Sequence, residues 1–192
     1  MGRKRMATAE LAVVAGAHPR RRLAPALASE LRAVALAAAA LLAVGTLGAL
    51  LALLDGSLID FPAPHPTLHP TLGAIASIFA NNLRALAVPF ILIASRFPSS
   101  RPSRIVGDAV VAGLLFANAV QVGFAIGRWQ GRLVPYLPHL PVEYLAASVA
   151  AGAWLSARRS QLLATIVRYG ALTVALLGAA AIVEVLLTPH AR

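Results

Sequence analysis

The stretch that decides the fold is AVALAAAALLAVGTLGALLALL, residues Ala33–Leu54. It contains no charged residue and lies between Arg32 and Asp55. A bilayer core about 30 Å thick is crossed by about 20 apolar residues of helix, so this stretch predicts a membrane span. It is longer than the roughly 7–15 apolar residues of a cleaved signal peptide, and we therefore expect it to be retained as a signal anchor.

The rest of the chain has the same apolar character. Apolar residues make up 59% of the 192 residues and charged residues only 12%, whereas soluble domains contain about 25% charged residues. The formal net charge is +10. Nucleic-acid-binding domains carry such a charge on a folded polar surface, whereas the Lys and Arg residues of this chain occur mainly in short groups between apolar runs. The composition excludes an ordinary soluble enzyme, a disordered tail and a nucleic-acid-binding domain. It predicts an integral membrane protein in a lipid bilayer.

Four further apolar stretches bring the expected number of spans to five. In one of them, Asn81-Asn82 either continues a helix or marks the bend of a re-entrant segment, and Pro89 predicts a kink. The expected fold is therefore all-α, a polytopic transmembrane helix bundle. The four stretches are Gly73–Ser95, Ile105–Gly127, the shorter Leu137–Ala157, and Leu162–Leu187.

Positive charge predicts the orientation, because cytoplasmic loops carry an excess of Lys and Arg. With the N-terminus in the cytoplasm, twelve of the 17 Lys and Arg residues lie inside, three lie outside and two lie within spans. The loop 55–72 contains no Lys or Arg, as expected of an outer loop. We expect a basic cytoplasmic segment at 1–32, a transmembrane domain at 33–187 and a short outer tail at 188–192.

Polar residues inside the apolar spans are costly, and each is a candidate for a functional site. At 1.5 Å per residue, four spans place such residues in the outer half of the bilayer, from its surface to roughly 17 Å below it. Three spans hold them at i,i+3 or i,i+4, spacings that share a helix face. The cluster expected from these positions is Asn81, Asn82, Arg84, Asn118, Gln121, His139, Glu143 and Glu184. Because lipid penalises both charges, we expect Arg84 to pair with Glu143.

A purely structural interpretation of the same residues stays open. Amides and charges can serve only to join helices, and such interhelical hydrogen bonds contribute about 0.6 kcal/mol on average. Gly45 in the first span and Gly123-x-x-x-Gly127 in the third predict close helix packing. Asn118 and Gln121 fit this interpretation better than Arg84 does, because an arginine near mid-bilayer costs about 2.5–3.5 kcal/mol.

The sequence offers little for catalysis or metal binding. His139 and Glu143 can bind a metal or relay a proton, but no third ligand is evident, and a zinc site needs at least three protein ligands. His65 and His69 lie in a proline-rich outer loop without a helix to align them, which favours exposed loop histidines. Nucleophile-elbow, zinc-protease and phosphate-loop motifs are absent. We therefore expect no enzyme, no metal and no cofactor.

Two stretches carry a resemblance to a known family. Residues 78–84, IFANNLR, resemble the asparagine-asparagine segment of the stage II sporulation protein M family of bacterial membrane proteins. Residues 138–144, PHLPVEY, resemble its later Pro-His-Gly-x-x-Glu-type motif, with Leu140 in place of the usual glycine. The order and separation of the two stretches match as well. The residues that match the motifs are Asn81, Asn82, Arg84, His139 and Glu143.

The resemblance implies a multi-pass protein of the bacterial plasma membrane without known catalysis. The family's named member works with cell-wall-degrading partners during engulfment, and we expect a non-enzymatic scaffold for envelope remodelling. Its partners would be membrane proteins or a second copy, bound within the membrane or at the loop 55–72. The alternative is a transporter or channel component in which the polar cluster forms a translocation or ion-coupling site.

Overall fold

The computed structural model describes residues 19–54, 71–96, 100–129, 133–134, 137–157 and 162–187, with side chains from residue 28 onward except at 162. Contacts divide the chain into two units, Met1–Arg32 and Ala33–Arg192, and the helix bundle lies in the second. The expectations for the loop histidines His65 and His69, and for the tail 188–192, lie outside the described residues.

Within the described residues the chain forms five α-helices and no strand. They are α2 (Pro19–Leu54), α3 (Leu72–Ala94), α4 (Arg101–Trp129), α5 (Leu140–Ala157) and α6 (Leu162–Leu187). The expectation of an all-α membrane bundle is confirmed, because α2, α3, α4 and α6 contain stretches long and apolar enough to cross a bilayer. α3 runs without a break through Asn81-Asn82 and past Pro89, so this segment is a continuous helix and not a re-entrant one.

Local sequence explains where α3 and α4 begin and end. Thr71 is the N-cap of α3, and its side chain accepts a hydrogen bond from the Ala74 N–H at 3.1 Å. After the helix, Arg96 adopts a left-handed conformation with φ 56°, the geometry that commonly closes a helix C-terminus. Ser100 and Ser103 then exchange hydrogen bonds between backbone N–H and side-chain oxygen, at 3.1 and 3.3 Å, and cap the start of α4.

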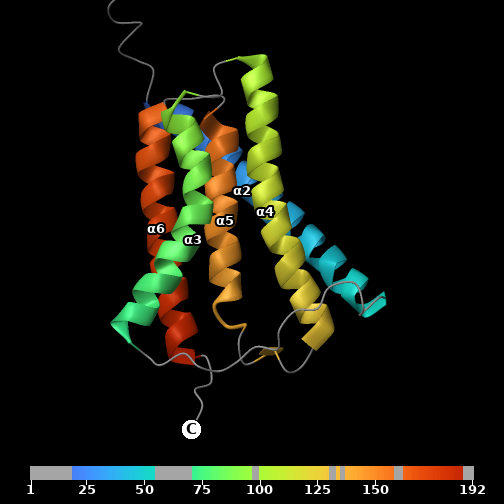
Figure 1. Cartoon of the computed structure of the whole chain (residues 1–192). Helices are drawn as coiled ribbons and strands as arrows, with labels where there is room; N and C mark the ends of the chain where they lie inside the picture. Colours follow the sequence, from blue (N-terminus) through green and yellow to red (C-terminus); the bar gives the residue numbers. More distant parts are fainter. Residues whose placement is uncertain are drawn as a thin grey trace, which may run out of the picture. The chain divides into compact units, whose positions relative to one another are not determined.

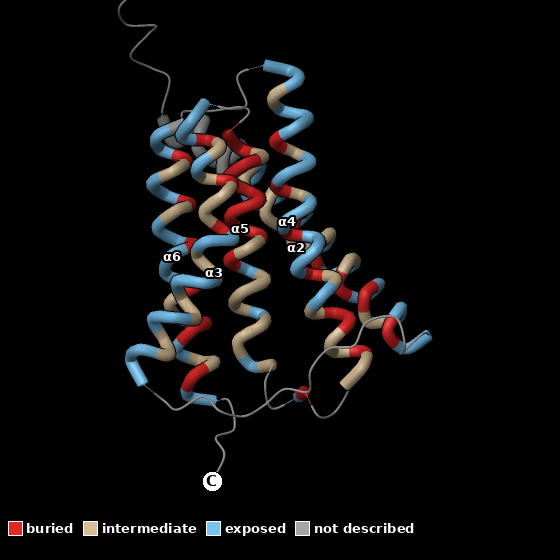
Figure 2. Tube along the Cα trace, viewed as in Figure 1, coloured by how far each residue is buried: buried red, intermediate tan, exposed pale blue. Residues whose placement is uncertain are grey.

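α5 is the central helix of the bundle. It packs against α3 and α6, which also pack against each other (Figure 1). Figure 2 shows the buried residues concentrated along α5, where nearly every position from Ala146 to Ala157 is buried. Most of these residues are Ala, Gly or Ser, and small side chains allow neighbouring helices to approach closely. The burial of α5 follows from this close approach of its neighbours.

The outward faces of the other helices carry large apolar side chains. Leu54 is 84% exposed and Leu163 is 73% exposed, and Leu36, Ile105 and Val167 are exposed as well. A soluble monomer rarely exposes so much contiguous apolar surface. Lipid accounts for it, since an apolar side chain loses nothing by facing acyl chains.

α2 and α4 cross in close contact at glycines, as the sequence predicts. A Cβ added to Gly123 would lie 1.8 Å from the Gly45 carbonyl oxygen, and one on Gly127 would lie 2.3 Å from that of Ala49. Any side chain at either position would force the two backbones apart. Glycine is therefore required at the crossing for close approach.

Candidate functional site

An imidazole, two carboxylates and an amide come together where the start of α5 and the end of α6 lie beside α3. His139 lies in the turn before α5, Glu143 in the first turn of α5, and Glu184 in the last turn of α6. Asn82 lies near the middle of α3. We name these four residues the His–Glu cluster.

The start of α5 positions His139 and Glu143 on the same face. The His139 carbonyl accepts hydrogen bonds from the N–H groups of Val142 at 3.0 Å and Glu143 at 3.1 Å, so the chain turns into the helix at this residue. The i,i+4 spacing then places the two side chains next to each other. A carboxylate in the first turn is also stabilised by the partial positive charge of the helix N-terminus.

The contacts of the cluster centre on one imidazole nitrogen. His139 Nε2 lies 3.9 Å from Glu143 Oε2 and 3.8 Å from Glu184 Oε2. Asn82 Nδ2 donates a hydrogen bond to the other carboxylate oxygen of Glu143, Oε1. The side chain of His139 is 12% exposed, and those of Glu143 and Glu184 are 23% and 22% exposed. These groups are therefore largely withdrawn from solvent, and each carboxylate keeps an oxygen directed at the imidazole.

The structure identifies Glu184, a member of the expected polar cluster, as a third metal-binding group beside His139 and Glu143. One ligand atom from each of His139, Glu143 and Glu184 lies within 4.8 Å of the others. Glu184 is distant in sequence and on another helix, so spacing rules cannot connect it with the first two residues. Its only signal in the sequence is a carboxylate near the outer end of the last span. Chemically, the three groups can share a proton or hold a divalent cation.

The other four residues of the expected cluster do not join it. Asn81 and Arg84 are exposed on α3, and Asn118 and Gln121 are exposed on α4. Within the described residues, no hydrogen bond or ion pair links these four to the His–Glu cluster. The polar site is therefore smaller than predicted, and it is built from α3, α5 and α6 without α4.

The expected pairing of Arg84 with Glu143 is corrected by the structure. Asn82 is the α3 residue that contacts Glu143, while Arg84 is exposed. Successive residues of an α-helix are rotated by about 100° about the helix axis. Arg84 follows Asn82 by two residues, so its side chain is rotated by about 200° from that of Asn82 and points away from α5. Asn81 and Arg84 do lie on the same face of α3, but this face points away from the bundle.

A second polar pair lies elsewhere in the bundle. Trp154 Nε1 on α5 donates a hydrogen bond of 2.7 Å to Asp108 Oδ1 on α4. Trp154 is only 2% exposed, so this bond satisfies an indole N–H that is withdrawn from water. This pair joins α4 to α5 and shares no residue with the His–Glu cluster.

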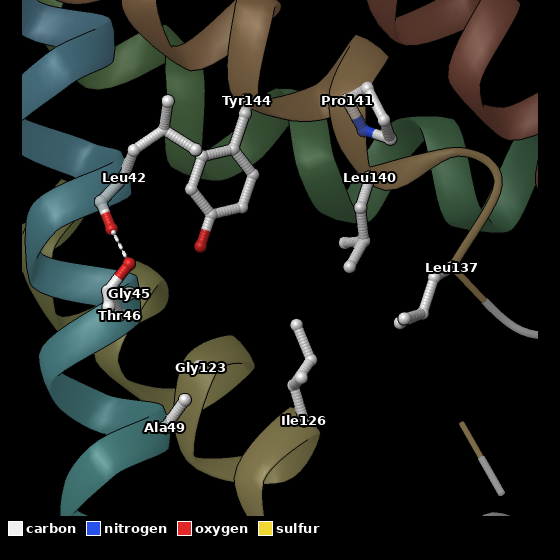
Figure 3. A pocket seen from close by; sticks show the side chains of 10 residues that line it. All are labelled: Leu42, Gly45, Thr46, Ala49, Gly123, Ile126, Leu137, Leu140, Pro141 and Tyr144. Atoms are coloured by element: carbon white, nitrogen blue, oxygen red, sulfur yellow. Dashed lines mark hydrogen bonds between the residues drawn. The ribbon is translucent and has the colours of Figure 1, made fainter. Parts of the chain in front are cut away.

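An apolar pocket of about 450 Å³ lies where α2, α4 and the start of α5 meet. Figure 3 shows Tyr144 directed into it from α5 and Ile126 directed into it from α4. Thr46 lies at its edge, but its hydroxyl donates to the Leu42 carbonyl of its own helix at 2.8 Å. The lining suits an alkyl chain better than a polar ligand.

Comparisons with known proteins neither support nor contradict the family resemblance. A scan against protein-family models finds no match, and searches of the curated proteins and of the solved structures find no significant similarity. The part of the chain that the structure describes is an all-helical bundle with four candidate membrane spans, and the function is proposed below from the chemistry of its residues.

Proposed function

We propose that the protein is a non-enzymatic multi-pass protein of the bacterial plasma membrane that holds partner membrane proteins, or a second copy of itself, during envelope or cell-wall remodelling. The resemblance of residues 78–84 and 138–144 to the stage II sporulation protein M family supports the envelope role. The surface of α4 supports the holding of partners.

The observation that carries this proposal is a pair of amide side chains on the outward face of α4. Asn118 and Gln121 are exposed, and the expected topology places them roughly 9–14 Å below the outer membrane boundary. An amide that faces acyl chains has no hydrogen-bond partner, and burial without one is costly. A helix of another protein can supply the partner, and Asn and Gln are typical residues for joining helices in membranes.

Small residues beside the amides favour close approach of such a helix. Gly113 and Ala117 are exposed on the same helix at i,i+4, and a Cβ at Gly113 would meet no atom within 4 Å. Gly and Ala at this spacing are common at interfaces between membrane helices. We name the face formed by Gly113, Ala117, Asn118 and Gln121 the α4 amide face.

Two buried serines, Ser148 and Ser156, contact structural partners inside the bundle, whereas the buried hydroxyl of Thr173 has no hydrogen-bond partner among the described residues. Ser148 donates to the Tyr144 carbonyl of its own helix at 2.6 Å. Ser156 lies 3.5 Å from the hydroxyl of Tyr169. A serine nucleophile needs a base within hydrogen-bond reach, and these contacts join helical turns and neighbouring helices instead.

Site-specific photo-crosslinking in cells tests the proposal. A photoreactive residue at Gln121 should form specific adducts that mass spectrometry identifies as a membrane protein or as a second copy of this chain. The same residue at Leu172, exposed on α6, is the control for non-specific labelling. The double variant Asn118→Leu, Gln121→Leu should lose the co-purifying partner, whereas Thr46→Val should keep it, because Thr46 is bonded within its own helix. Equal crosslinking from both positions, to the same abundant proteins, would contradict the proposal.

The His–Glu cluster favours a second candidate, a transporter or channel component. Ionisable groups within membrane segments often mark ion or proton pathways. The test is solute or ion flux into liposomes that contain only this protein. Flux that is lost in Glu143→Gln and kept in Asp108→Asn would favour transport over the scaffold. Absence of flux in wild-type protein that has retained its fold would exclude a self-contained carrier.

A further inference from the structure

We propose that His139, Glu143 and Glu184 bind one divalent transition-metal ion of the Zn²⁺ type, and that Asn82 orients Glu143 for this binding. The inference does not depend on the proposed scaffold role. It rests on the donor atoms, their separations, their charge and their position between two helix ends.

The donor set fits this class of ion. Imidazole nitrogen and carboxylate oxygen are both ordinary zinc ligands, and three protein ligands leave a fourth position for water or another group. Carboxylates alone would favour Mg²⁺ or Ca²⁺, but an imidazole shifts the preference towards first-row transition metals. His139 Nε2 is the nitrogen that faces both carboxylates.

The separations also fit. The two nitrogen–oxygen distances, 3.9 and 3.8 Å, are longer than a hydrogen bond. Ligand atoms at zinc bond lengths of about 2.0–2.2 Å around a tetrahedral ion lie about 3.3–3.6 Å apart. All three ligand atoms lie within 4.8 Å of one another, so rotation of the side chains towards a common centre would bring them onto one ion.

Charge balance gives a further physical reason. Two ionised carboxylates held in a largely desolvated site are costly without compensation. Among the described residues, their only ion-pair contacts are with His139, and one imidazolium can neutralise only one of them. A divalent cation with a neutral imidazole neutralises both.

Asn82 has the role of a second-layer residue. Its amide donates to Glu143 Oε1, which leaves Oε2, the oxygen nearer to His139 Nε2, directed at the proposed ion. Hydrogen bonds to ligating carboxylates fix their orientation, and their removal typically weakens metal binding 10–100-fold. A bound ion would also tie the start of α5 to the end of α6.

Metal titration of the purified full-length protein tests the proposal. The protein carries a purification tag without histidine, is treated with a chelator, and is titrated in nanodiscs with Zn²⁺ by isothermal calorimetry. We expect one equivalent to bind. The variants His139→Gln, Glu143→Gln and Glu184→Gln should each weaken binding at least about tenfold, and Asn82→Ala should weaken it about 10–100-fold. Co²⁺ should show d–d absorption bands that are lost in the same variants.

Two controls separate this site from other ligands in the chain. Asp108→Asn removes a carboxylate outside the cluster and keeps an oxygen acceptor for Trp154, so it should bind Zn²⁺ like the wild type. The double variant His65→Gln, His69→Gln should also keep the stoichiometric site. The proposal fails if the wild type binds no Zn²⁺, if the triple variant of His139, Glu143 and Glu184 binds as tightly as the wild type, or if the loop-histidine variant abolishes binding.

Discussion

Among single residues, Asn82 and Glu143 form the contact with the clearest energetic consequence. A hydrogen bond to a charged group contributes about 1.5–3 kcal/mol in soluble proteins, whereas interhelical bonds in membranes average about 0.6 kcal/mol. We expect a coupling free energy of about 1–2 kcal/mol between Asn82→Leu and Glu143→Leu. The double variant should lose less stability than the two single variants added together, as measured by reversible unfolding in mixed micelles.

Arg84 provides the matched control for this double-mutant cycle, because it lies on the same helix and is exposed. Arg84→Leu and Glu143→Leu should be additive within about 0.5 kcal/mol, as expected of residues that share no contact. If Arg84 coupled to Glu143 and Asn82 did not, α3 would have to be rotated about its axis relative to the arrangement described above.

Among elements, the crossing of α2 and α4 depends on glycine. Gly123→Ala places a Cβ 1.8 Å from the Gly45 carbonyl oxygen, so the helices must separate. Overpacking of this kind costs about 1–3 kcal/mol. Gly113→Ala on the same helix meets open space, and alanine is the better helix former by up to about 1 kcal/mol. Thermal unfolding in detergent should show a loss for the first variant and no loss for the second; equal effects would place the crossing elsewhere.

For the whole molecule, the positive charges predict that the end of α3 at Leu72 faces outside and the end at Ser95 faces inside. Both residues are exposed, and the chain has no cysteine of its own. In intact cells, a membrane-impermeant maleimide should label Leu72→Cys and should leave Ser95→Cys unlabelled until the cells are opened. The reverse pattern would overturn the predicted orientation.

The number of crossings depends on α5. It is the shortest of the five helices in the described residues, at 18 residues, and it is not among the four candidate spans found there. Its length of about 27 Å is close to the thickness of a bilayer core, and we predict that it crosses. Five crossings place the C-terminus outside, so a C-terminal alkaline phosphatase fusion should be active and a C-terminal green fluorescent protein fusion should be dark. The opposite result would mean an even number of crossings.

The positions of the membrane helices could be predicted from the sequence because hydropathy is a local property. The expected span Gly73–Ser95 differs by one residue at each end from α3, Leu72–Ala94, and the expected span Leu162–Leu187 coincides with α6. α2 differs more, since it begins at Pro19 and not at Ala33. An apolar run shows which part of a helix can lie in lipid, but not where the helix begins. Arg, Ala and Leu all have high helix propensity, so α2 continues before the apolar run into polar surroundings.

All four members of the His–Glu cluster are among the eight residues that the sequence predicts for the polar site. Which of the eight meet could not be predicted, because it depends on the rotation of each helix about its axis. Asn81 and Asn82 are chemically identical and adjacent, yet only Asn82 contacts Glu143, since one residue changes the side-chain direction by about 100°. Glu184 joins His139 only through the packing of α6 against α5. The sequence by itself determined a bundle of apolar helices, because burial in lipid depends on each segment alone. The tertiary structure decided which polar groups meet, because contacts between helices depend on how small residues let their surfaces pack.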